Sequence, residues 1–204
     1  MKKPLFFNSI TINLPKTRIY KRLGYRNGFT KVSKKKQREI DKYICDALFF
    51  VELKAAAIIT KISKGAKGIS MGGEVFSSNL LSSLLKNSNE ALICAATAGN
   101  KIMDEIKECE QLDLTRAVIF DAVASEMADS VFDWITDYFN RDLLKKRQCL
   151  TKKRISCGYY DFSIKDQKKI YDLLKLKKIG INITKSYMLL PEKSATAVLG
   201  VIDL

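Results

Sequence analysis

The longest regular pattern of hydrophobic positions in this chain runs from Asp113 to Leu144 and predicts one long helix. Asp113 is a suitable residue to cap its first turn. The apolar side chains are spread widely around the helical wheel, so we expect most of this helix to be buried. They are Val118, Ala122, Ala124, Met127, Ala128, Val131, Ile135 and Tyr138.

Four shorter segments also carry helix signals, either apolar residues at helical spacing or a residue that caps a first turn. Ser163 with Asp166 resembles a capping box, in which two polar side chains satisfy backbone N–H groups at a helix start. The four predicted helices cover residues 33–51, the run NLLSSLLK after Ser77 or Ser78, residues 100–110 and residues 164–176.

Five segments of strand length either alternate apolar and polar residues or are apolar almost throughout. They are residues 5–14, 55–62, 90–97, 179–183 and 195–202. The run EALICAAT at residues 90–97 predicts a buried strand. Gly24 and Asn27-Gly28 mark turns within residues 18–28, and the glycines between residues 65 and 73 mark a hairpin or tight loop.

The order of helix, strand, turn and helix through residues 77–110 is typical of proteins that mix both kinds of element. No internal repeat, low-complexity tract or linker divides the chain. We therefore expect a single domain over residues 1–204.

The chain contains no histidine, which excludes His-based triads, His general bases and His metal ligands. Its five cysteines are odd in number and form no C-x-x-C pair. We therefore expect no disulfide framework and no metal site, and a reducing cytoplasm fits best. No apolar run approaches the length that spans a bilayer.

Lysine and arginine number 36 against 22 acidic residues, which gives a net charge of +14. Such a balance favours acidic partners, among them nucleic acid, an acidic protein or an anionic cofactor. A general enrichment in lysine explains it equally well.

The long predicted helix carries the only concentrated negative charge in this basic chain. Its polar positions recur every four residues and share one face, at Asp121, Ser125, Asp129, Asp133 and Asp137. Like charges at this spacing repel, so a compensating group is expected. Nearby lysines are one candidate. The alternative is that Glu126 or Asp129 meets a cationic ligand or the loop that carries Arg154.

The segment R-I-S-C-G-Y at residues 154–159 combines a fixed cation, a hydroxyl, a thiol, a glycine and an aromatic ring. Arginine can fork onto a carboxylate, glycine lets the backbone approach a ligand, and tyrosine stacks on a planar base. The set suits a nucleoside that carries an amino-acid carboxylate. It does not suit acid–base catalysis, because no paired carboxylates or histidine accompany it. A structural loop explains the same residues equally well.

Several ordered stretches resemble the activation (reactivation) domain of cobalamin-dependent methionine synthase, in a stand-alone form. The resemblance covers roughly residues 18–200, with residues 1–17 as a loosely matched extension. It rests on RLGYRNG (22–28), AATAG (95–99), DAVASEMAD (121–129), RISCGY (154–159), DQKKIYDLL (166–174) and IGINITKSYMLLPEKS (179–194). The last and RISCGY are the most specific. The resemblance implies an α+β fold, a twisted, mainly antiparallel sheet surrounded by helices.

The resemblance also implies that S-adenosylmethionine is the cofactor. The family's R-x-x-x-G-Y segment grips that molecule, and it matches Arg154, the backbone of Ser156, Gly158 and Tyr159 here. An acid on the long helix lines the family's site, and Glu126 is the candidate. Lys185 departs from the pattern, because the family has a glutamate there.

The implied role is an accessory one: reductive remethylation of oxidised cob(II)alamin on a methionine synthase core or other corrinoid protein, with a flavodoxin-like electron donor. The basic segment 141–178, with thirteen Lys or Arg and four acids, would suit an acidic partner. Two alternatives remain. One is a scaffold that binds a corrinoid protein but has lost the ligand, and the other is a basic nucleic-acid-binding module, against which stands the lack of a recognised motif.

Overall fold

The computed structural model describes residues 3–26, 29–66 and 68–204. Within these residues seven strands form one sheet in the order β4-β3-β2-β5-β9-β6, with β1 also pairing with β2. Every pairing is antiparallel. The strands are β1 (Leu5–Phe7), β2 (Lys54–Gly65), β3 (Gly68–Met71), β4 (Glu74–Phe76), β5 (Glu90–Thr97), β6 (Gln148–Leu150) and β9 (Ser194–Asp203).

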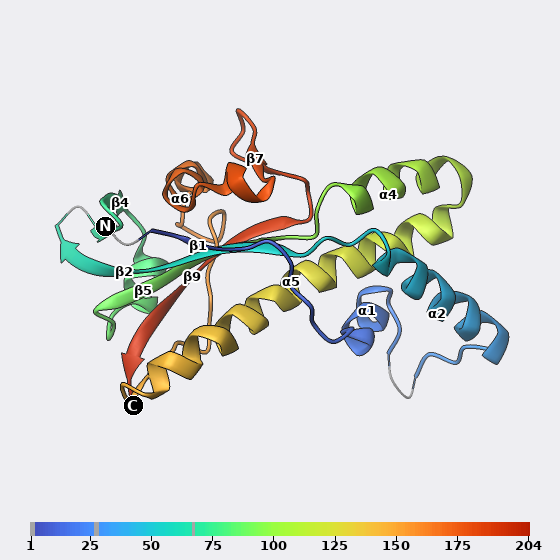
Figure 1. Cartoon of the computed structure of the whole chain (residues 1–204), viewed down its shortest axis with the longest axis horizontal. Coiled ribbons are helices and arrows are strands. Elements are labelled where there is room, and N and C mark those ends of the chain that lie inside the picture. The colour runs from blue at the N-terminus through green and yellow to red at the C-terminus, as the bar shows by residue number, and fades with distance from the viewer. Residues whose placement is uncertain (1–2, 27–28, 67) are drawn as a thin grey trace.

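Helices cover both faces of this sheet (Figure 1). The long α5 runs along one face and extends past the sheet to meet α4 and α2, whereas α6 lies on the other face. The helices are α1 (Lys16–Arg22), α2 (Lys34–Leu48), α3 (Asn79–Leu84), α4 (Lys101–Leu112), α5 (Leu114–Leu144) and α6 (Gln167–Leu174). Two 3-10 turns, η1 (Ile164–Asp166) and η2 (Leu176–Ile179), flank α6, and β7 (Asn182–Ile183) pairs with β8 (Leu189–Leu190) in a small hairpin.

The three central strands are apolar on both sides because both sides are covered. In β5, Leu92, Cys94 and Ala96 pack towards α5, while Ala91, Ile93 and Ala95 pack towards α6. β2 divides in the same way, with Ala55 and Ala57 on the first side and Ala56 and Ile58 on the second. This alternation produces one hydrophobic core on each face of the sheet.

The predicted α+β fold with an antiparallel sheet and surrounding helices is confirmed. The predicted caps are also present: Asp113 accepts a hydrogen bond from the backbone N–H of Arg116 (3.0 Å), and Ser78 accepts one from Leu81 (3.0 Å). Gly72 and Gly73 form a tight turn between β3 and β4, and Gly65 pairs with Gly68 where β2 and β3 meet, as expected for a hairpin.

Three predictions about elements need correction. The first strand covers only Leu5–Phe7, because residues 8–14 leave the sheet to reach the helices. Residues 16–22 form α1, where only turns were expected. Ile179 closes η2 rather than opening a strand. The edge strand β6 was not predicted, and the Asn27-Gly28 turn lies outside the described residues.

Among the helices that the structure describes, none is both long and apolar enough to cross a membrane.

Candidate functional site

The segment that carries R-I-S-C-G-Y is a loop held at several points between β6 and η1. Ile155 exchanges two backbone hydrogen bonds with Val198 of β9, at 3.1 and 2.8 Å. Phe162 is fully buried and packs edge-on against Phe76. Asp161 accepts hydrogen bonds from the first backbone N–H groups of α3, at Asn79 (2.6 Å) and Leu80 (3.1 Å). These anchors fix the loop on the sheet.

Between the anchors the chain makes a tight turn. Gly158 adopts φ +92°, a conformation that residues with a side chain rarely adopt, and its N–H donates to the carbonyl of Phe162 at 2.7 Å. The turn directs Tyr159 and Tyr160 outwards, with 62% and 94% of their surfaces exposed. Two aromatic rings therefore stand at the edge of the loop, available to a ligand.

This loop forms one wall of a cavity of about 940 Å³. The second wall is the segment from β8 to the start of β9, and the long helix α5 contributes Asp129 and Phe132. The two most specific motifs of the sequence, RISCGY and the end of IGINITKSYMLLPEKS, thus line one cavity. Its polar and aromatic lining includes Arg154, Ser156, Tyr159, Tyr160, Gln167, Glu192, Lys193 and Thr196.

Arg154 is tied to the acidic stripe of α5. Its Nη2 bonds to Asp129 at 2.7 Å and its Nη1 to Asp133 at 2.9 Å, and its guanidinium lies over the ring of Phe132. Burial acts to lower the pKa of Arg154, but these two carboxylates outweigh it and raise the pKa. The guanidinium is therefore a permanent cation at the cavity wall. Both compensating groups that the sequence left open are present on the stripe, since Arg154 pairs with Asp129 and Lys193 pairs with Asp121.

Glu126 points elsewhere. It is buried, and its carboxylate accepts a 2.6 Å hydrogen bond from Arg22 of α1 and lies 3.8 Å from Arg18. Glu126 does not line the cavity, and neither does Gly158, which shapes the turn instead. Among the predicted site residues, the structure brings together Arg154, Ser156 and Tyr159, and the acid that α5 supplies to the cavity is Asp129.

The α1 helix explains why the acids of α5 can lie so close together. Arg18 pairs with Asp133 (2.9 Å) and also hydrogen bonds to Ser130. Arg18, Arg22 and Arg154 therefore offset Glu126, Asp129 and Asp133 along one face of α5.

Sequence reasoning missed other residues that line the cavity. Gln167 and Thr196 are buried, and the Thr196 hydroxyl donates to the Gln167 side chain at 2.8 Å. Gln167 belongs to the DQKKIYDLL stretch, which carried part of the family resemblance. Nothing in the sequence, however, indicated that Gln167 would contact β9. Lys185 lies in the β7–β8 turn, exposed and away from the cavity.

Cys157 is the one thiol on the cavity lining, and it is buried. Burial raises its pKa to about 12, so the thiol stays protonated near neutral pH. A protonated thiol is a poor nucleophile. Cys157 is therefore not an activated nucleophile in this cavity.

No known protein-family profile matches this sequence, and no curated protein matches it either. A solved structure described as the MetH reactivation domain bound to AdoHcy does match. It superposes with a TM-score of 0.69 at 12% sequence identity, over 97% of this chain and 78% of that one. The chain therefore has the fold of the MetH reactivation domain.

Proposed function

We propose that this protein binds S-adenosylmethionine in the cavity beside Arg154 and serves as a reactivation subunit for a cobalamin-dependent enzyme. The observation that carries the proposal is the Arg154–Asp129 pair, 2.7 Å apart at the wall of a cavity of about 940 Å³. The fold agrees with it, because the MetH reactivation domain of the matching structure holds AdoHcy.

The pair suits the amino-acid end of the ligand. Such a group carries a carboxylate and an ammonium, which require a cation and an anion side by side. Arginine has five N–H donors in a planar fork, so Arg154 can take a carboxylate while it keeps contacts with Asp129. The carboxylate of Asp129 can accept a hydrogen bond from the ammonium.

The rest of the cavity suits a positively charged sulfur and a nucleoside. The lining carries two carboxylates, Asp129 and Glu192, and two cations, Arg154 and Lys193, of which Lys193 pairs with Asp121 at 2.6 Å. Glu192 is therefore the carboxylate that can face a sulfonium. Tyr159 and Tyr160 offer exposed rings on which a base can stack, and Ser156 offers hydrogen-bonding groups.

The role that follows is one of positioning. When bound, S-adenosylmethionine would supply a methyl group to the cobalamin of the partner after the electron donor has reduced it, and S-adenosylhomocysteine would remain. Arg154 and Asp129 would hold the amino-acid end still, and the anchored loop would keep the methyl group aimed at the partner. No acid–base residue is required, which agrees with a cavity without histidine.

The partners we propose are a cobalamin-binding methionine synthase core or another corrinoid protein, and a flavodoxin-like electron donor. The basic segment 141–178 would attract acidic partners to the side of the chain that carries Arg154. We propose a cytoplasmic location, since the five cysteines are all unpaired.

Calorimetric titration with S-adenosylmethionine tests the proposal. We expect micromolar-range binding by the native chain, weakened at least about tenfold by Arg154→Ala, because a charge-assisted hydrogen bond is lost. Arg22→Ala is the matched control. It also removes an arginine that pairs with an acid of α5, Glu126, but neither Arg22 nor Glu126 lines the cavity. Binding should therefore remain close to native in that variant.

Two results would contradict the proposal. Equal weakening by Arg22→Ala and Arg154→Ala would mean that the ion pairs support the fold and not the ligand. No binding of S-adenosylmethionine, together with retained binding to a cobalamin-carrying methionine synthase core, would favour a scaffold that has lost its ligand.

A further inference from the structure

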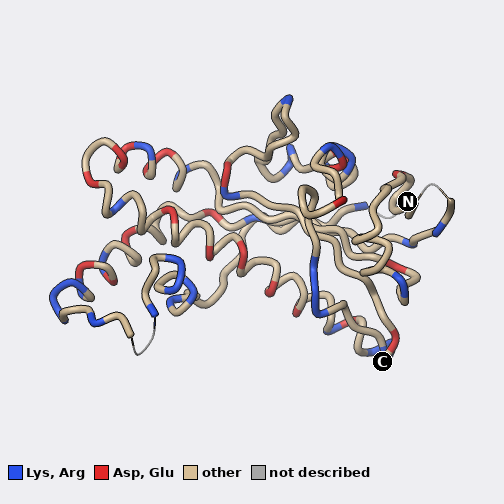
Figure 2. The backbone as a smooth tube through the Cα atoms, turned by 180° about the vertical axis from the view of Figure 1, so that it is seen from behind, with Lys and Arg blue, Asp and Glu red and all other residues tan. Residues whose placement is uncertain are grey.

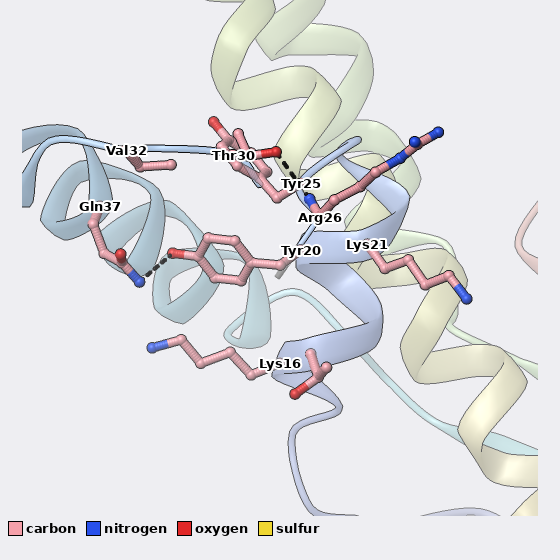
Figure 3. Close-up of a pocket in the computed structure, with 9 residues that line it drawn as sticks. Lys16, Tyr20, Lys21, Tyr25, Arg26, Thr30, Val32 and Gln37 are labelled. Carbon is pink, nitrogen blue, oxygen red and sulfur yellow. Dashed lines mark hydrogen bonds between the residues drawn. The ribbon is translucent and has the colours of Figure 1, made fainter. Parts of the chain in front are cut away.

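A second cavity lies at the other end of the chain, between α1 and α2. It has a volume of about 580 Å³, within the range of small-molecule sites, and shares no lining residue with the cavity beside Arg154. Its lining is Lys16, Thr17, Tyr20, Lys21, Tyr25, Arg26, Thr30, Val32 and Gln37. Figure 3 shows Tyr20 at its centre, with Lys21 and Arg26 reaching out on one side and Lys16 on the other.

The cations around this cavity are not equivalent. The charge of Lys16 is neutralised by Asp41, whose carboxylate lies 2.8 Å from the Lys16 Nζ. The same carboxylate accepts a hydrogen bond from the Tyr20 hydroxyl at 2.8 Å. In the described part of the chain, no carboxylate forms an ion pair with Lys21 or Arg26. Both side chains are exposed on the same side of the opening. An anionic group would therefore bind at the Lys21–Arg26 side.

The surrounding charge strengthens this preference. Residues 16–42 contain eleven Lys or Arg and two acids, a net of +9. Figure 2 shows these basic positions gathered over α1 and α2. Arg18 and Arg22 pair with acids of α5, whereas Lys21 and Arg26 do not within the described residues. A concave site in such a field attracts anions over several ångströms.

The remaining lining suits a planar ring that carries an amino group. Tyr20 and Tyr25 meet edge-to-face, with centroids 5.4 Å apart, and Val32 adds an apolar contact. The Gln37 amide N–H₂ donates to the Tyr20 hydroxyl at 3.4 Å, which leaves its carbonyl oxygen as an acceptor. Thr17 supplies a hydroxyl that is not hydrogen bonded within the described residues.

We propose that this second cavity binds a mononucleotide, a small phosphorylated compound with a planar amino-bearing ring. Its phosphate contacts Lys21 and Arg26, its ring packs against Tyr20 and Tyr25, and its amino group donates to Gln37. The site is independent of the cavity beside Arg154, so it stands whether or not S-adenosylmethionine binds there.

Calorimetry with adenosine monophosphate as the probe tests this site, with adenosine and inorganic phosphate as separate arms. We expect adenosine monophosphate to bind more tightly than either arm. Lys21→Ala and Arg26→Ala should each weaken it by about tenfold or more, the effect of losing a charge-assisted hydrogen bond to phosphate. Lys34→Ala and Lys35→Ala remove the same charge from the first turn of α2, outside the cavity, and should change it less than about twofold.

Three outcomes would overturn the proposal. The first is no binding of adenosine monophosphate at millimolar concentration. The second is an equal loss in the Lys34 and Lys35 variants, which would reduce the effect to general attraction by a basic surface. The third is a loss on Arg154→Ala but not on Lys21→Ala, which would place the probe in the other cavity. Circular dichroism of each variant confirms that it is folded.

Discussion

Arg154 connects the RISCGY loop to α5 through ion pairs with two acidic side chains. It contacts Asp129 and Asp133 directly, and Asp133 in turn pairs with Arg18. All of these pairs are partly exposed to solvent, so each stabilises the fold only modestly. Their larger effect is on geometry, because a guanidinium that is hydrogen bonded through both terminal nitrogens is held in one orientation. The cavity therefore presents a fixed cation before any ligand arrives.

Gly158 sets the shape of the loop beside that cation. Replacing it with alanine should destabilise the fold by about 1–2 kcal/mol, because φ +92° is a left-handed conformation that a Cβ disfavours. The added Cβ itself would find room, since its nearest neighbour, Cδ1 of Ile164, lies 3.4 Å away. Urea unfolding measures the change, and titration with S-adenosylmethionine should show weaker binding as the turn relaxes.

Gly65→Ala is the control for this substitution. Gly65 has an ordinary φ, and no neighbouring atom lies within 4 Å of the place that an alanine Cβ would take. Its replacement should therefore change stability by less than about 0.5 kcal/mol. If the two alanine variants were equally stable, the turn at Gly158 would not require glycine.

At the scale of elements, α5 organises the chain, and its first turn depends on Asp113. The Asp113 carboxylate accepts hydrogen bonds from the backbone N–H of Arg116 (3.0 Å) and from the Tyr43 hydroxyl of α2 (2.8 Å). The hydrogen bond from the Arg116 N–H, and to a lesser degree the one from Tyr43, holds the pKa of Asp113 below its ordinary value. A lowered folded-state pKa means that the charged carboxylate favours the folded protein.

The stability that Asp113 contributes should therefore depend on pH in one direction. It is complete above the ordinary carboxyl pKa of about 4 and is lost as the pH falls through the lower folded-state value. Asp113→Asn keeps an oxygen that can accept both hydrogen bonds but does not titrate. We expect the native chain to lose its advantage over Asp113→Asn between about pH 5 and pH 2.

Urea unfolding of both proteins across that range measures the difference. Asp113→Ala, which removes the cap as well as the charge, should be less stable than Asp113→Asn throughout. A difference between native and Asp113→Asn that stays constant with pH would contradict the assignment.

The elements that sequence could predict are those whose own pattern determines them. α5 and β5 carry long apolar patterns with clear ends, so their bounds were close to those observed. α1 could not be predicted, because KTRIYKR contains one buried residue, Ile19, and no side-chain cap. What stabilises it is tertiary: Arg18 and Arg22 pair with α5. β6 has three residues and, among the described strands, pairs with β9 alone, so its sequence gives no signal.

The same division holds for the cavity. The pairing of Arg154 with the acidic stripe could be expected from charge and spacing, and Asp129 was one of two candidate acids. The spacing could not decide between Glu126 and Asp129, because the choice depends on where Arg22 and the Arg154 loop meet α5: Arg22 pairs with Glu126, and Arg154 pairs with Asp129. Gln167 and Thr196 meet only because the first residue of α6 lies against β9, a contact that no local pattern encodes.

At the scale of the whole molecule, positive charge is divided between two regions with the acids of α5 between them (Figure 2). Residues 16–42 and residues 141–178 each carry a net charge of +9. The second region includes the approach to the cavity, because exposed Lys152 and Lys153 directly precede Arg154. A partner steered by these lysines would meet the molecule beside the candidate ligand.

This arrangement predicts that position, and not only total charge, governs association with a corrinoid partner. The double variant Lys152→Glu with Lys153→Glu should slow association with a cobalamin-carrying methionine synthase core by about tenfold or more at low salt, because steering scales with local charge. The double variant Lys34→Glu with Lys35→Glu changes the net charge equally but at the start of α2. It should slow association far less. Surface plasmon resonance at several salt concentrations separates the two, since the difference should shrink as salt screens the charges. Equal slowing by both variants would mean that the partner responds only to net charge, and the surface around Arg154 would then not be the docking face.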